Sequence, residues 1–343
     1  MANISSLSLQ NPSQPKFTGD SSIMASAIDL YSACDDAIPT IDYSLLFSND
    51  PHQRSLALEY LGQACHHYGF FNLVNHGIPD KLLDNFFHGI SEFFDPMMLD
   101  ERRALYSKKD AMDRIRWVLR SSSGENREYL KVISHPNYHF PPNPSCFSEV
   151  LGEYHKEMRK IVVGLARAVS INLGFEEDYI EKAFNLKSGF DVSAMILYPP
   201  NHISKGEMGL PEHTDPGFIV TLVQNVDGGL QILSHHGKWI NVQIPPHAIL
   251  IQLGDHLEIL TNGKYKSHIH RVVVAKNEVE RISVATLHGP SLEKSVRPAP
   301  EFVDETHPQA YLGMTYKQCL EANGDDEIES QSSLHLIKLP NIN

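Results

Sequence analysis

The chain reads Phe218-Ile-Val-Thr-Leu-Val-Gln224, Gly229-Leu-Gln-Ile-Leu233, Lys238-Trp-Ile-Asn-Val242 and Ala248-Ile-Leu-Ile-Gln-Leu253 in close succession. Glycine, proline or asparagine separates each run from the next, and these residues favour turns. Short runs rich in valine and isoleucine between turn residues are typical of β-strands. The same pattern holds at 192–198, 269–275 and 281–287. It predicts a small antiparallel barrel or jelly roll in the second half of the chain.

The first half of the chain shows helical spacing instead. Apolar residues recur every three or four positions over 58–68, 83–94 and 151–169, which is the spacing of one helix face. Asp80 stands where an N-cap would precede the second helix. Further expectations are a strand at 68–76, loops with short elements at 107–146, and a partly helical lid from 300 onward. The fold class is therefore α+β with a mainly β core.

Composition argues against several classes of protein. The 343 residues carry a net charge of −13, which would repel the phosphates of a nucleic acid. No uncharged apolar stretch reaches the roughly 18 residues of a membrane span, and residues 1–20 lack the features of a secretory signal. The cysteines are scattered, as in reduced proteins, at Cys34, Cys65, Cys146 and Cys319. We therefore expect a cytoplasmic monomer with a small-molecule partner, no nucleic-acid partner and no membrane association.

His213-Thr-Asp-Pro-Gly217 is the first candidate metal site. Alternate residues of an extended segment point the same way, so His213 and Asp215 can present an imidazole and a carboxylate to one ion. Pro216 disfavours helix at Asp215, which helps to hold that geometry. Alone the pair is a weak signal, because an H-x-D match is expected by chance among 19 histidines. A surface histidine beside a turn-capping aspartate would give the same pattern.

Ser267-His-Ile-His-Arg271 is the second candidate. One of its histidines would complete a set of two histidines and one carboxylate, which is diagnostic of non-haem Fe(II) oxygenases. Periodicity does not choose between His268 and His270, because both lie on the same face of a strand. His256 and Glu258 form a rival pair that is more simply interpreted as turn and supporting residues.

Arg281-Ile-Ser283 is a candidate anion site. Arg281 and Ser283 share a strand face, and their apolar neighbours suggest burial. A buried arginine needs an anionic partner. Its guanidinium can bind a carboxylate through two hydrogen bonds, to which Ser283 adds a donor. A structural salt bridge is the alternative.

In combination, His213-x-Asp215, His270 and Arg281-x-Ser283 resemble the plant 2-oxoglutarate- and Fe(II)-dependent dioxygenases. The resemblance covers about residues 38–315, and several short motifs in family order are more specific than any one of them. Those motifs are Ile38-Pro-x-Ile-Asp42, Gly69-Phe-Phe-x-x-x-Asn-His-Gly77, Tyr198-Pro-Pro, Gly209-Leu-x-x-His213, Gly228-Gly-Leu-Gln-Ile232 and Gly254-Asp-x-Leu-Glu-Ile-Leu-x-Asn-Gly-Lys-Tyr-Lys-Ser267.

The resemblance implies a role for each matching residue. His213, Asp215 and His270, the histidine directly before Arg271, match the catalytic iron ligands. Arg281 and Ser283 match the pair that binds the distal carboxylate of 2-oxoglutarate, and Tyr198 matches a tyrosine that helps to hold it. The implied reaction uses Fe(II), 2-oxoglutarate and O2 to oxidise a small plant specialised metabolite, with release of succinate and CO2. Hydroxylation is the commonest outcome, and demethylation, desaturation, epoxidation and ring closure are alternatives.

The resemblance also implies a double-stranded β-helix, or jelly roll, with a helical amino-terminal region and a C-terminal helical lid. The expected divisions are a flexible tail (1–36), an amino-terminal dioxygenase region (37–145), a long supporting helix (146–190), the jelly-roll core (191–295) and a C-terminal tail or lid (296–343). The chain departs from the family at Ile196-Leu-Tyr-Pro-Pro-Asn201, where Asn-Tyr-Tyr-Pro-Pro-Cys is common, and 202–207 lack the usual Pro-x-Pro-Glu. The first departure concerns an auxiliary contact to the co-substrate, and the second concerns the loop before the strand that carries the iron ligand. Either feature can therefore differ from the family.

The substrate is the part that the sequence defines least. Candidate pocket positions are Tyr129, Phe218, His288 and Phe302, each of which could equally be a core or surface residue. Three other functions are compatible with parts of the pattern. They are an iron oxidase that does not use 2-oxoglutarate, a zinc hydrolase, which would need a nearby general base, and a non-catalytic jelly-roll binding protein.

Thiol titration of the denatured, unreduced protein should find four reactive groups, because no cysteine spacing favours a disulfide framework. A chromogenic thiol reagent measures this directly. A titration that finds no free thiol would contradict a reducing compartment.

Overall fold

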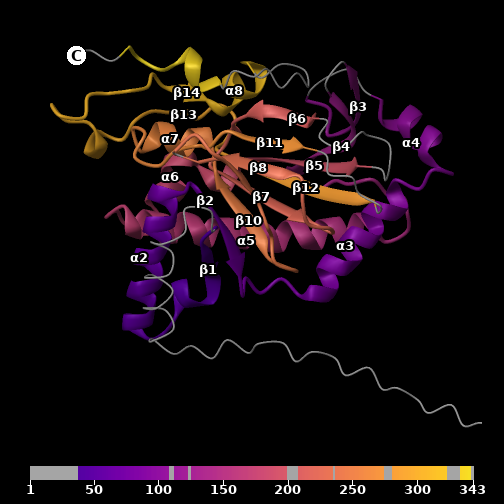
Figure 1. The fold of residues 1–343 in the computed structure, drawn as a ribbon, viewed down its shortest axis with the longest axis horizontal. Coiled ribbons are helices and arrows are strands. Elements are labelled where there is room, and N and C mark those ends of the chain that lie inside the picture. The colour runs from indigo at the N-terminus through magenta and orange to yellow at the C-terminus, as the bar shows by residue number, and fades with distance from the viewer. Residues whose placement is uncertain are drawn as a thin grey trace, which may run out of the picture. The chain divides into compact units, whose positions relative to one another are not determined.

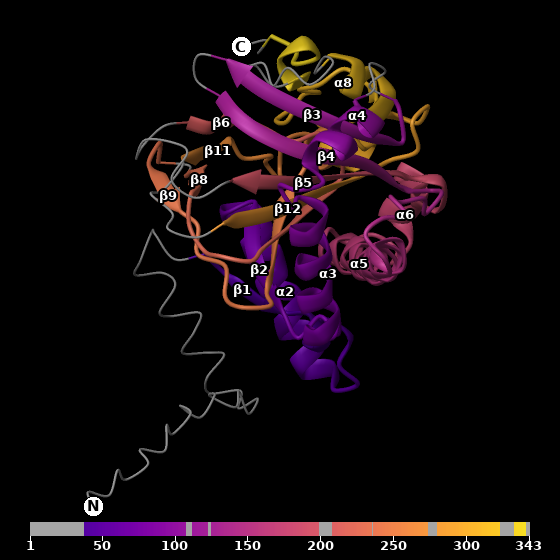
Figure 2. The ribbon, with the colours of Figure 1, turned by 90° about the vertical axis from the view of Figure 1, so that its right-hand side faces the viewer.

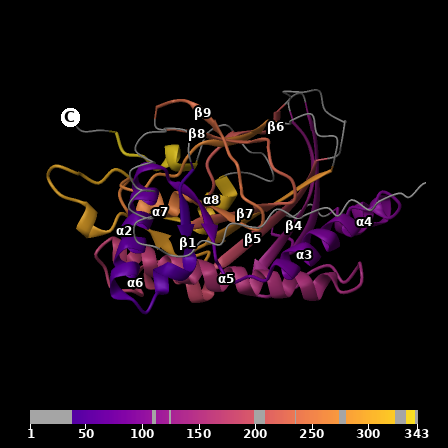
Figure 3. The ribbon, with the colours of Figure 1, turned by 60° about the horizontal axis from the view of Figure 1, so that its bottom comes forward.

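The computed structural model describes residues 38–107, 112–122, 125–198, 208–234, 236–273, 280–322 and 333–340. The expected tail at 1–36 and the departures at Asn201 and 202–207 lie outside these residues. Two β-sheets face each other, and a layer of helices covers one of them (Figure 1, Figure 3). The jelly-roll fold predicted from the sequence is confirmed.

Within the described residues the larger sheet has eight strands in the order β1-β2-β10-β7-β12-β5-β4-β3. They are β1 (Thr40–Asp42), β2 (Phe70–Val74), β3 (Ile115–Ser122), β4 (Glu125–His135), β5 (Phe190–Tyr198), β7 (Ile219–Gln224), β10 (Ile249–Leu253) and β12 (Arg281–Gly289). Neighbours pair antiparallel, apart from the parallel pair of β1 and β2. Figure 2 shows β3, β4, β5 and β12 as successive strands.

The smaller sheet has the order β6-β11-β8-β9 among the described residues. Its strands are β6 (Met208–His213), β8 (Leu230–Leu233), β9 (Trp239–Asn241) and β11 (His270–Val273). A separate short pair joins β13 (Ser295–Val296) to β14 (Met314–Thr315). Consecutive strands such as β7 and β8 fall in different sheets, so the chain passes back and forth between the two layers as a jelly roll requires.

The long helices form the third layer. The long ones are α2 (Pro51–His67), α3 (Asp80–Phe93) and α5 (Phe147–Asn172), and the short ones are α4 (Leu99–Tyr106), α6 (Tyr179–Phe184), α7 (Asp255–Leu260) and α8 (Tyr316–Ala322). Single 3-10 turns occur at η1 (Tyr43–Phe47), η2 (Leu186–Ser188), η3 (Pro300–Phe302) and η4 (Ser333–Leu336). Asp80 is the first residue of α3 and not its N-cap, because the extended backbone of Pro79 takes that position. No described helix is both long and apolar enough to span a membrane.

Alternation along each strand of the larger sheet separates two faces. On β5, Met195 and Leu197 belong to the core shared with the helices, whereas Ile196 and Tyr198 belong to a cluster that includes residues of both sheets. We call these the outer face and the inner face. The inner cluster consists of Phe70, Val118, Tyr129, Ile196, Tyr198, Leu210, Leu222, Leu230, Ile232, Val242, Ile244, Ala248, Leu250 and Val272. Any side chain that meets a ligand inside the jelly roll must therefore occupy an inner-face position.

The prediction of loops at 107–146 is wrong, because β3 and β4 form a long hairpin that extends the larger sheet. The outer face of this hairpin packs on the helical layer: the Trp117 ring lies 5.7 Å from Phe93 and 5.2 Å from Phe94. Its inner face carries Lys131 beside Tyr129, so the apolar period is broken on that side. A strand with charged residues on one face and apolar residues beside them loses the alternation by which strands are recognised.

His155 of α5 is enclosed by aromatic rings in the helical layer. Its ring is parallel to that of Phe140, with centroids 5.2 Å apart, and it lies edge-on to Phe86 and Tyr154. The Nε2 atom is buried and has no hydrogen-bond partner among the described residues. Burial lowers the pKa of His155 from 6.5 to about 3. The folded protein therefore holds this imidazole neutral.

We expect this burial to make the fold acid-sensitive. Between pH 6.5 and about 3 the unfolded chain binds a proton at His155 that the folded chain does not, so the free energy of unfolding falls as the pH falls through this window. The slope is at most about 1.4 kcal/mol per pH unit. Urea denaturation of His155→Phe at several pH values should show a smaller slope than the wild type. The exposed His88→Phe should keep the wild-type slope, and equal slopes for all three proteins would contradict the assignment.

Candidate active site

Three ligand-type side chains meet at the end of β6. Antiparallel pairing of β6 with β11 sets His270 directly opposite His213. The Nε2 atoms of His213 and His270 lie 3.6 and 3.3 Å from the two carboxylate oxygens of Asp215, and one ligand atom from each residue lies within 4.8 Å of the others. Donors about 2.1 Å from an ion and at right angles to each other are separated by about 3 Å. The triad therefore fits a metal ion of the size of Fe(II).

Both imidazoles are oriented by backbone carbonyls. The Nδ1 atom of His213 lies 2.7 Å from the Pro211 carbonyl oxygen, and that of His270 lies 3.3 Å from the His268 carbonyl oxygen. A carbonyl accepts only from a protonated nitrogen, so the lone pair of each ring is on Nε2, the atom that faces Asp215. Burial raises the pKa of the Asp215 carboxyl and the nearby His270 opposes that effect.

Backbone hydrogen bonds hold the turn that carries Asp215. The Asp255 amide donates to the Asp215 carbonyl at 2.9 Å, and the Phe218 amide donates to the His288 carbonyl at 2.8 Å. Gly217 has φ +106, and a Cβ there would lie 2.9 Å from the same His288 oxygen, so only glycine suits the position. His256 accepts from the Gly217 amide through Nδ1. His256 is therefore a supporting residue of the turn, as the sequence suggested.

The structure brings His270, and not His268, to Asp215. The His268 ring lies edge-on to Phe70 at 5.8 Å, and its Nδ1 is 3.1 Å from the Leu233 carbonyl oxygen. Glu258, the other member of the rival pair, accepts hydrogen bonds from Lys266, Tyr311 and the Ser267 amide. It supports the segment before β11 and does not belong to the triad.

Arg281 and Ser283 lie on the inner face of β12, with Tyr198 directly across from Arg281 on β5. Arg281 is only 2% exposed, and its guanidinium carbon lies 4.9 Å from the centre of the Tyr198 ring. Burial lowers the pKa of Arg281, and Tyr198 and Asp227 oppose that effect. Its Nε and Nη1 atoms and the Tyr198 hydroxyl are buried without a hydrogen-bond partner among the described residues. A carboxylate in this position would satisfy donors that the protein leaves unpaired.

Sequence reasoning missed the residues that hold Arg281. Gln224, across from Ser283 on β7, accepts from Arg281 Nη2 at 2.9 Å and donates to Asp227 at 2.7 Å. The register of β7 against β12 is needed to see this contact. The sequence signal for Gln224 was a polar residue at the end of a mainly apolar strand.

Comparison with known proteins identifies the family. The profile of the 2OG-Fe(II) oxygenase superfamily matches residues 185–290, and that of the N-terminal region of the non-haem dioxygenases in morphine synthesis matches residues 38–145. The 2-oxoglutarate-dependent dioxygenase 19 of Oryza sativa subsp. japonica is 32% identical over 321 residues, which cover 92% of this chain and 94% of the rice protein. The chain belongs to the 2OG-Fe(II) oxygenase superfamily.

Other relatives of this oxygenase act on different molecules. Flavanone 3-dioxygenase 3 of Oryza sativa subsp. japonica is 31% identical over 83% of this chain and 87% of its own. The 1-aminocyclopropane-1-carboxylate oxidase 5 of Arabidopsis thaliana is 34% identical over 80% of this chain and 90% of its own. The crystal structure of JOX2 in complex with 2OG, Fe and JA has a TM-score of 0.77 at 28% identity, covering 88% of this chain and 89% of that one. The protein is a 2-oxoglutarate-dependent Fe(II) dioxygenase, not a zinc hydrolase or a binding protein without catalysis.

Of the four candidate substrate residues in the oxygenase, only Tyr129 lies on the inner face. Phe218 packs in the outer core with its ring 5.3 Å from Phe184 of α6. His288 is an even-numbered residue of β12, whereas the inner face of that strand carries the odd-numbered Arg281 and Ser283. Phe302 lies in η3 with its ring 5.5 Å from Phe175. The structure thus does not bring these last three residues to the interior of the jelly roll.

His288 belongs instead to a buried network on the outer face. Its Nδ1 lies 3.1 Å from the carboxylate of Asp191, and its Nε2 lies 3.2 Å from the Thr221 hydroxyl. Arg159 of α5 donates to the same Asp191 oxygen at 2.6 Å. Burial alone would raise the pKa of Asp191, but His288 and Arg159 together lower it to about 2. The network fastens β5, β7 and β12 to α5 behind the active site.

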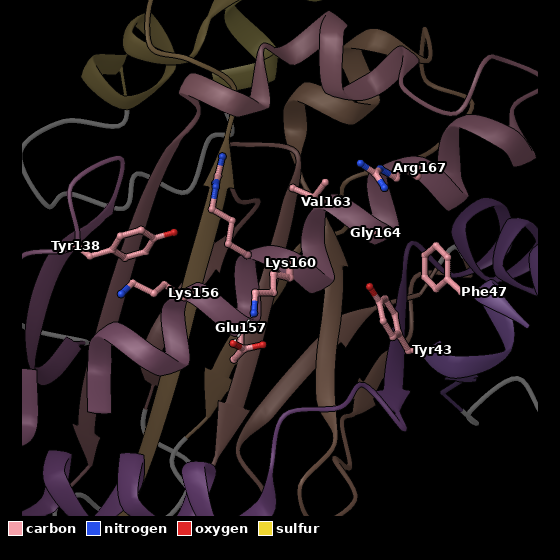
Figure 4. A pocket seen from close by; sticks show the side chains of 10 residues that line it. Tyr43, Phe47, Tyr138, Lys156, Glu157, Lys160, Val163, Gly164 and Arg167 are labelled. Atoms are coloured by element: carbon pink, nitrogen blue, oxygen red, sulfur yellow. Dashed lines mark hydrogen bonds and ion pairs between the residues drawn. The ribbon is translucent and has the colours of Figure 1, made fainter. Parts of the chain in front are cut away.

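A surface cleft of 690 Å³ lies along α5, in the helical layer (Figure 4). Gly164 makes room there for the Tyr43 hydroxyl, which would lie 2.1 Å from an added Cβ. The lining residues are Tyr43, Phe47, Tyr138, Lys156, Glu157, Arg159, Lys160, Val163, Gly164 and Arg167. Neither the triad nor Arg281 is among them, so this cleft is not the reaction site.

His270→Ala should weaken Fe(II) binding by more than about 100-fold and abolish turnover, because loss of a direct ligand costs more than loss of a supporting residue. His268→Ala is the matched control and should keep both the metal and most of the activity. Anaerobic Fe(II) titration with equilibrium dialysis measures the difference. Retention of iron by His270→Ala together with its loss in His268→Ala would show that the wrong histidine has been assigned.

Proposed function

We propose that His213, Asp215 and His270 bind Fe(II), and that Arg281, Ser283 and Tyr198 bind 2-oxoglutarate for the oxidation of a small plant metabolite. One observation supports this most strongly. A facial triad and a buried guanidinium with unpaired N–H groups both open onto the interior between the two sheets. This arrangement accommodates a dicarboxylate. One end of the dicarboxylate chelates the metal, and the other end binds the arginine.

The metal ligands and the residues that bind the co-substrate lie at two ends of the interior of the jelly roll. The triad supplies three donors on one side of the metal and leaves its other positions open to ligands. Arg281 binds the far carboxylate through its planar fork, while Gln224 fixes the orientation of the guanidinium. When bound, Fe(II) would supply the oxidising chemistry: O2 and 2-oxoglutarate would give CO2 and succinate, which takes up one oxygen atom, and the second oxygen atom would be available to oxidise the substrate.

The protein contributes exclusion of water and a fixed geometry. The inner cluster is apolar around Arg281 and Ser283, so their hydrogen bonds to a carboxylate are stronger than they would be in water. At the other end of the interior, Tyr316 of α8 packs with Phe190 and Val192 of β5. Closure by α8 as a lid stays a prediction. A site closed to bulk water also prevents side reactions of the oxidant.

Hydroxylation of the substrate is the outcome that we propose, with demethylation, desaturation, epoxidation or ring closure as the alternatives from the same site. We also propose that the enzyme works as a cytoplasmic monomer without a nucleic-acid partner. The net charge of −13 supports the last point. Among the described cysteines, Cys65, Cys146 and Cys319 are free thiols, as a reducing compartment requires.

Arg281→Lys should raise the KM for 2-oxoglutarate by at least about tenfold, because an ammonium cannot reproduce the two-pronged contact of a guanidinium. Bound Fe(II) and the melting temperature should change little. Steady-state assays that follow succinate measure the effect.

Arg159→Lys is the matched control for a buried arginine. Arg159 is bound to Asp191 on the outer face, so its substitution should lower the melting temperature and leave the KM for 2-oxoglutarate unchanged. If Arg281→Lys behaves like Arg159→Lys, Arg281 is a structural ion-pair residue and not the anchor of the co-substrate.

A further inference from the structure

Two buried carboxamides lie on the inner face of the larger sheet, on the neighbouring strands β2 and β10. Phe70 of β2 and Leu250 of β10 belong to the inner cluster, and alternate residues of a strand share a face. Asn72 and Gln252, each two residues farther along, therefore also face the interior. Asn72 is 4% exposed and Gln252 is 5% exposed. We call these two residues the amide pair.

Each member of the amide pair has one amide atom without a partner. The Asn72 Nδ2 atom donates to the Gln243 carbonyl oxygen at 3.1 Å, which fixes the orientation of this amide and leaves its Oδ1 atom as an acceptor. Asn72 Oδ1 and Gln252 Nε2 are buried without a hydrogen-bond partner among the described residues. A buried polar atom that stays unpaired destabilises the folded chain, because it has lost its hydrogen bonds to water. The amide pair thus offers one acceptor and one donor to a ligand.

The sheet register places the two amides close together. Antiparallel pairing sets Leu250 opposite Asn72 and Gln252 opposite Phe70, so Asn72 and Gln252 are diagonal neighbours. Diagonal neighbours are roughly 7 Å apart, which is within reach of a long side chain. The adjoining inner-face residues are apolar: Phe70, Leu250 and Val220, which pairs with Gln252 from β7. A single polar group can therefore meet both amides in apolar surroundings.

Gln252 lies at the end of β10 that is nearest the iron ligands. Three residues farther on, the Asp255 amide donates to the Asp215 carbonyl at 2.9 Å. Phe70, which is opposite Gln252, has its ring edge-on to His268, on the segment that leads into β11. The contacts of β10 and β2 with both ligand-bearing segments place the amide pair beside the metal end of the interior.

The amide pair is separate from the proposed anchor of 2-oxoglutarate. The central strands of the larger sheet follow the order β2-β10-β7-β12-β5. The amide pair occupies the first two of these strands, whereas Arg281 and Tyr198 occupy the last two. The donor and the acceptor on the β2 side can therefore bind a second ligand while the co-substrate is in place.

We propose that the organic substrate of this oxygenase carries a hydroxyl group, and that the amide pair binds this hydroxyl. A hydroxyl can accept from Gln252 Nε2 and donate to Asn72 Oδ1 at the same time. An ionised carboxylate cannot donate to Asn72, and an ammonium cannot accept from Gln252. The inference rests on the proposed function, because it places the substrate beside the iron ligands. The substrate class is therefore a neutral molecule with an apolar body and a hydroxyl group.

Binding of matched phenols tests the two hydrogen bonds. The Fe(II)–2-oxoglutarate form of the full chain is titrated under anaerobic conditions, so that no turnover occurs, with 4′-hydroxyflavanone, 7-hydroxycoumarin and 5-hydroxyindole. The parent compounds without the hydroxyl and the methyl ethers are titrated in the same way, and isothermal calorimetry gives each dissociation constant. At least one phenol should bind at least about tenfold more tightly than its parent and its ether, because a site that hydrogen-bonds a hydroxyl strongly rejects analogues without it.

Substitution of Gln252 separates a binding role from a structural one. Gln252→Met keeps an unbranched side chain of similar length and removes the amide. It should weaken binding of that phenol at least about tenfold and change binding of the parent compound less than about twofold. The melting temperature should not fall, because Gln252 Nε2 makes no hydrogen bond to the described residues. The dissociation constant of 2-oxoglutarate should stay at the wild-type value.

Gln231→Met is the matched control for loss of a glutamine. Gln231 of β8 accepts from Arg271 at 2.9 Å and donates to Asn241 at 2.9 Å, so its amide is already bonded at both ends. This variant should lower the melting temperature slightly and leave phenol binding within about twofold of the wild type.

Other results overturn the inference in distinguishable ways. Equal binding of phenols and parent compounds, or binding of no phenol by protein that still binds 2-oxoglutarate, shows that the amide pair is not a hydroxyl site and leaves the proposed function standing. A Gln252→Met protein that melts below Gln231→Met and keeps the wild-type preference for the phenol makes Gln252 a structural residue. Loss of 2-oxoglutarate affinity in Gln252→Met assigns the amide pair to the co-substrate. Failure of the wild type to bind 2-oxoglutarate at all contradicts the proposed function, and the inference with it.

Discussion

The proposed iron site depends on the pairing of β6 with β11. That pairing sets His213 across from His270, two residues that are far apart in the sequence, and directs both imidazoles toward Asp215. A slip of one residue in either strand would turn one histidine to the other side of the smaller sheet. The register is protected by the contacts around it. Val272 and Leu210 pair farther along the same two strands inside the inner cluster, and β8 pairs with the other edge of β11.

The second constraint is the separation of two faces on the larger sheet. Arg281, Ser283 and Tyr198 face the smaller sheet, while Asp191, Thr221 and His288 face the helices. Two polar networks thus lie on opposite sides of the same few strands without mixing. Arg159 of α5 pairs with Asp191 in the outer network and binds the sheet to that helix, whereas Arg281 of the inner network has Nε and Nη1 atoms without a hydrogen-bond partner among the described residues. The arginine of the outer network thus has an anionic partner within the chain, and we propose that the arginine of the inner network takes one from a ligand.

Much of this architecture could be predicted from the sequence, and the failures have definite physical causes. Every strand predicted after residue 190 is present: those of the larger sheet are buried almost throughout, and those of the smaller sheet are short apolar runs bounded by turn residues. The β3–β4 hairpin was missed because Lys131 and Arg116 interrupt the apolar period on the inner face. Phe218 and His288 were predicted to be pocket residues because the sequence does not show which of the two alternating sets of residues in a strand lies on the inner face. The contact between Gln224 and Arg281 could not be predicted from the sequence, because it depends on the register of β7 against β12.

The unpaired N–H groups of Arg281 have a consequence for the life of the protein in the cell. A buried guanidinium with unsatisfied donors lowers the stability of the folded chain until a carboxylate arrives. Any ligand that binds only the folded state raises that stability in proportion to the logarithm of its concentration. Binding of 2-oxoglutarate to the folded protein therefore also protects the chain from proteolysis of the unfolded state.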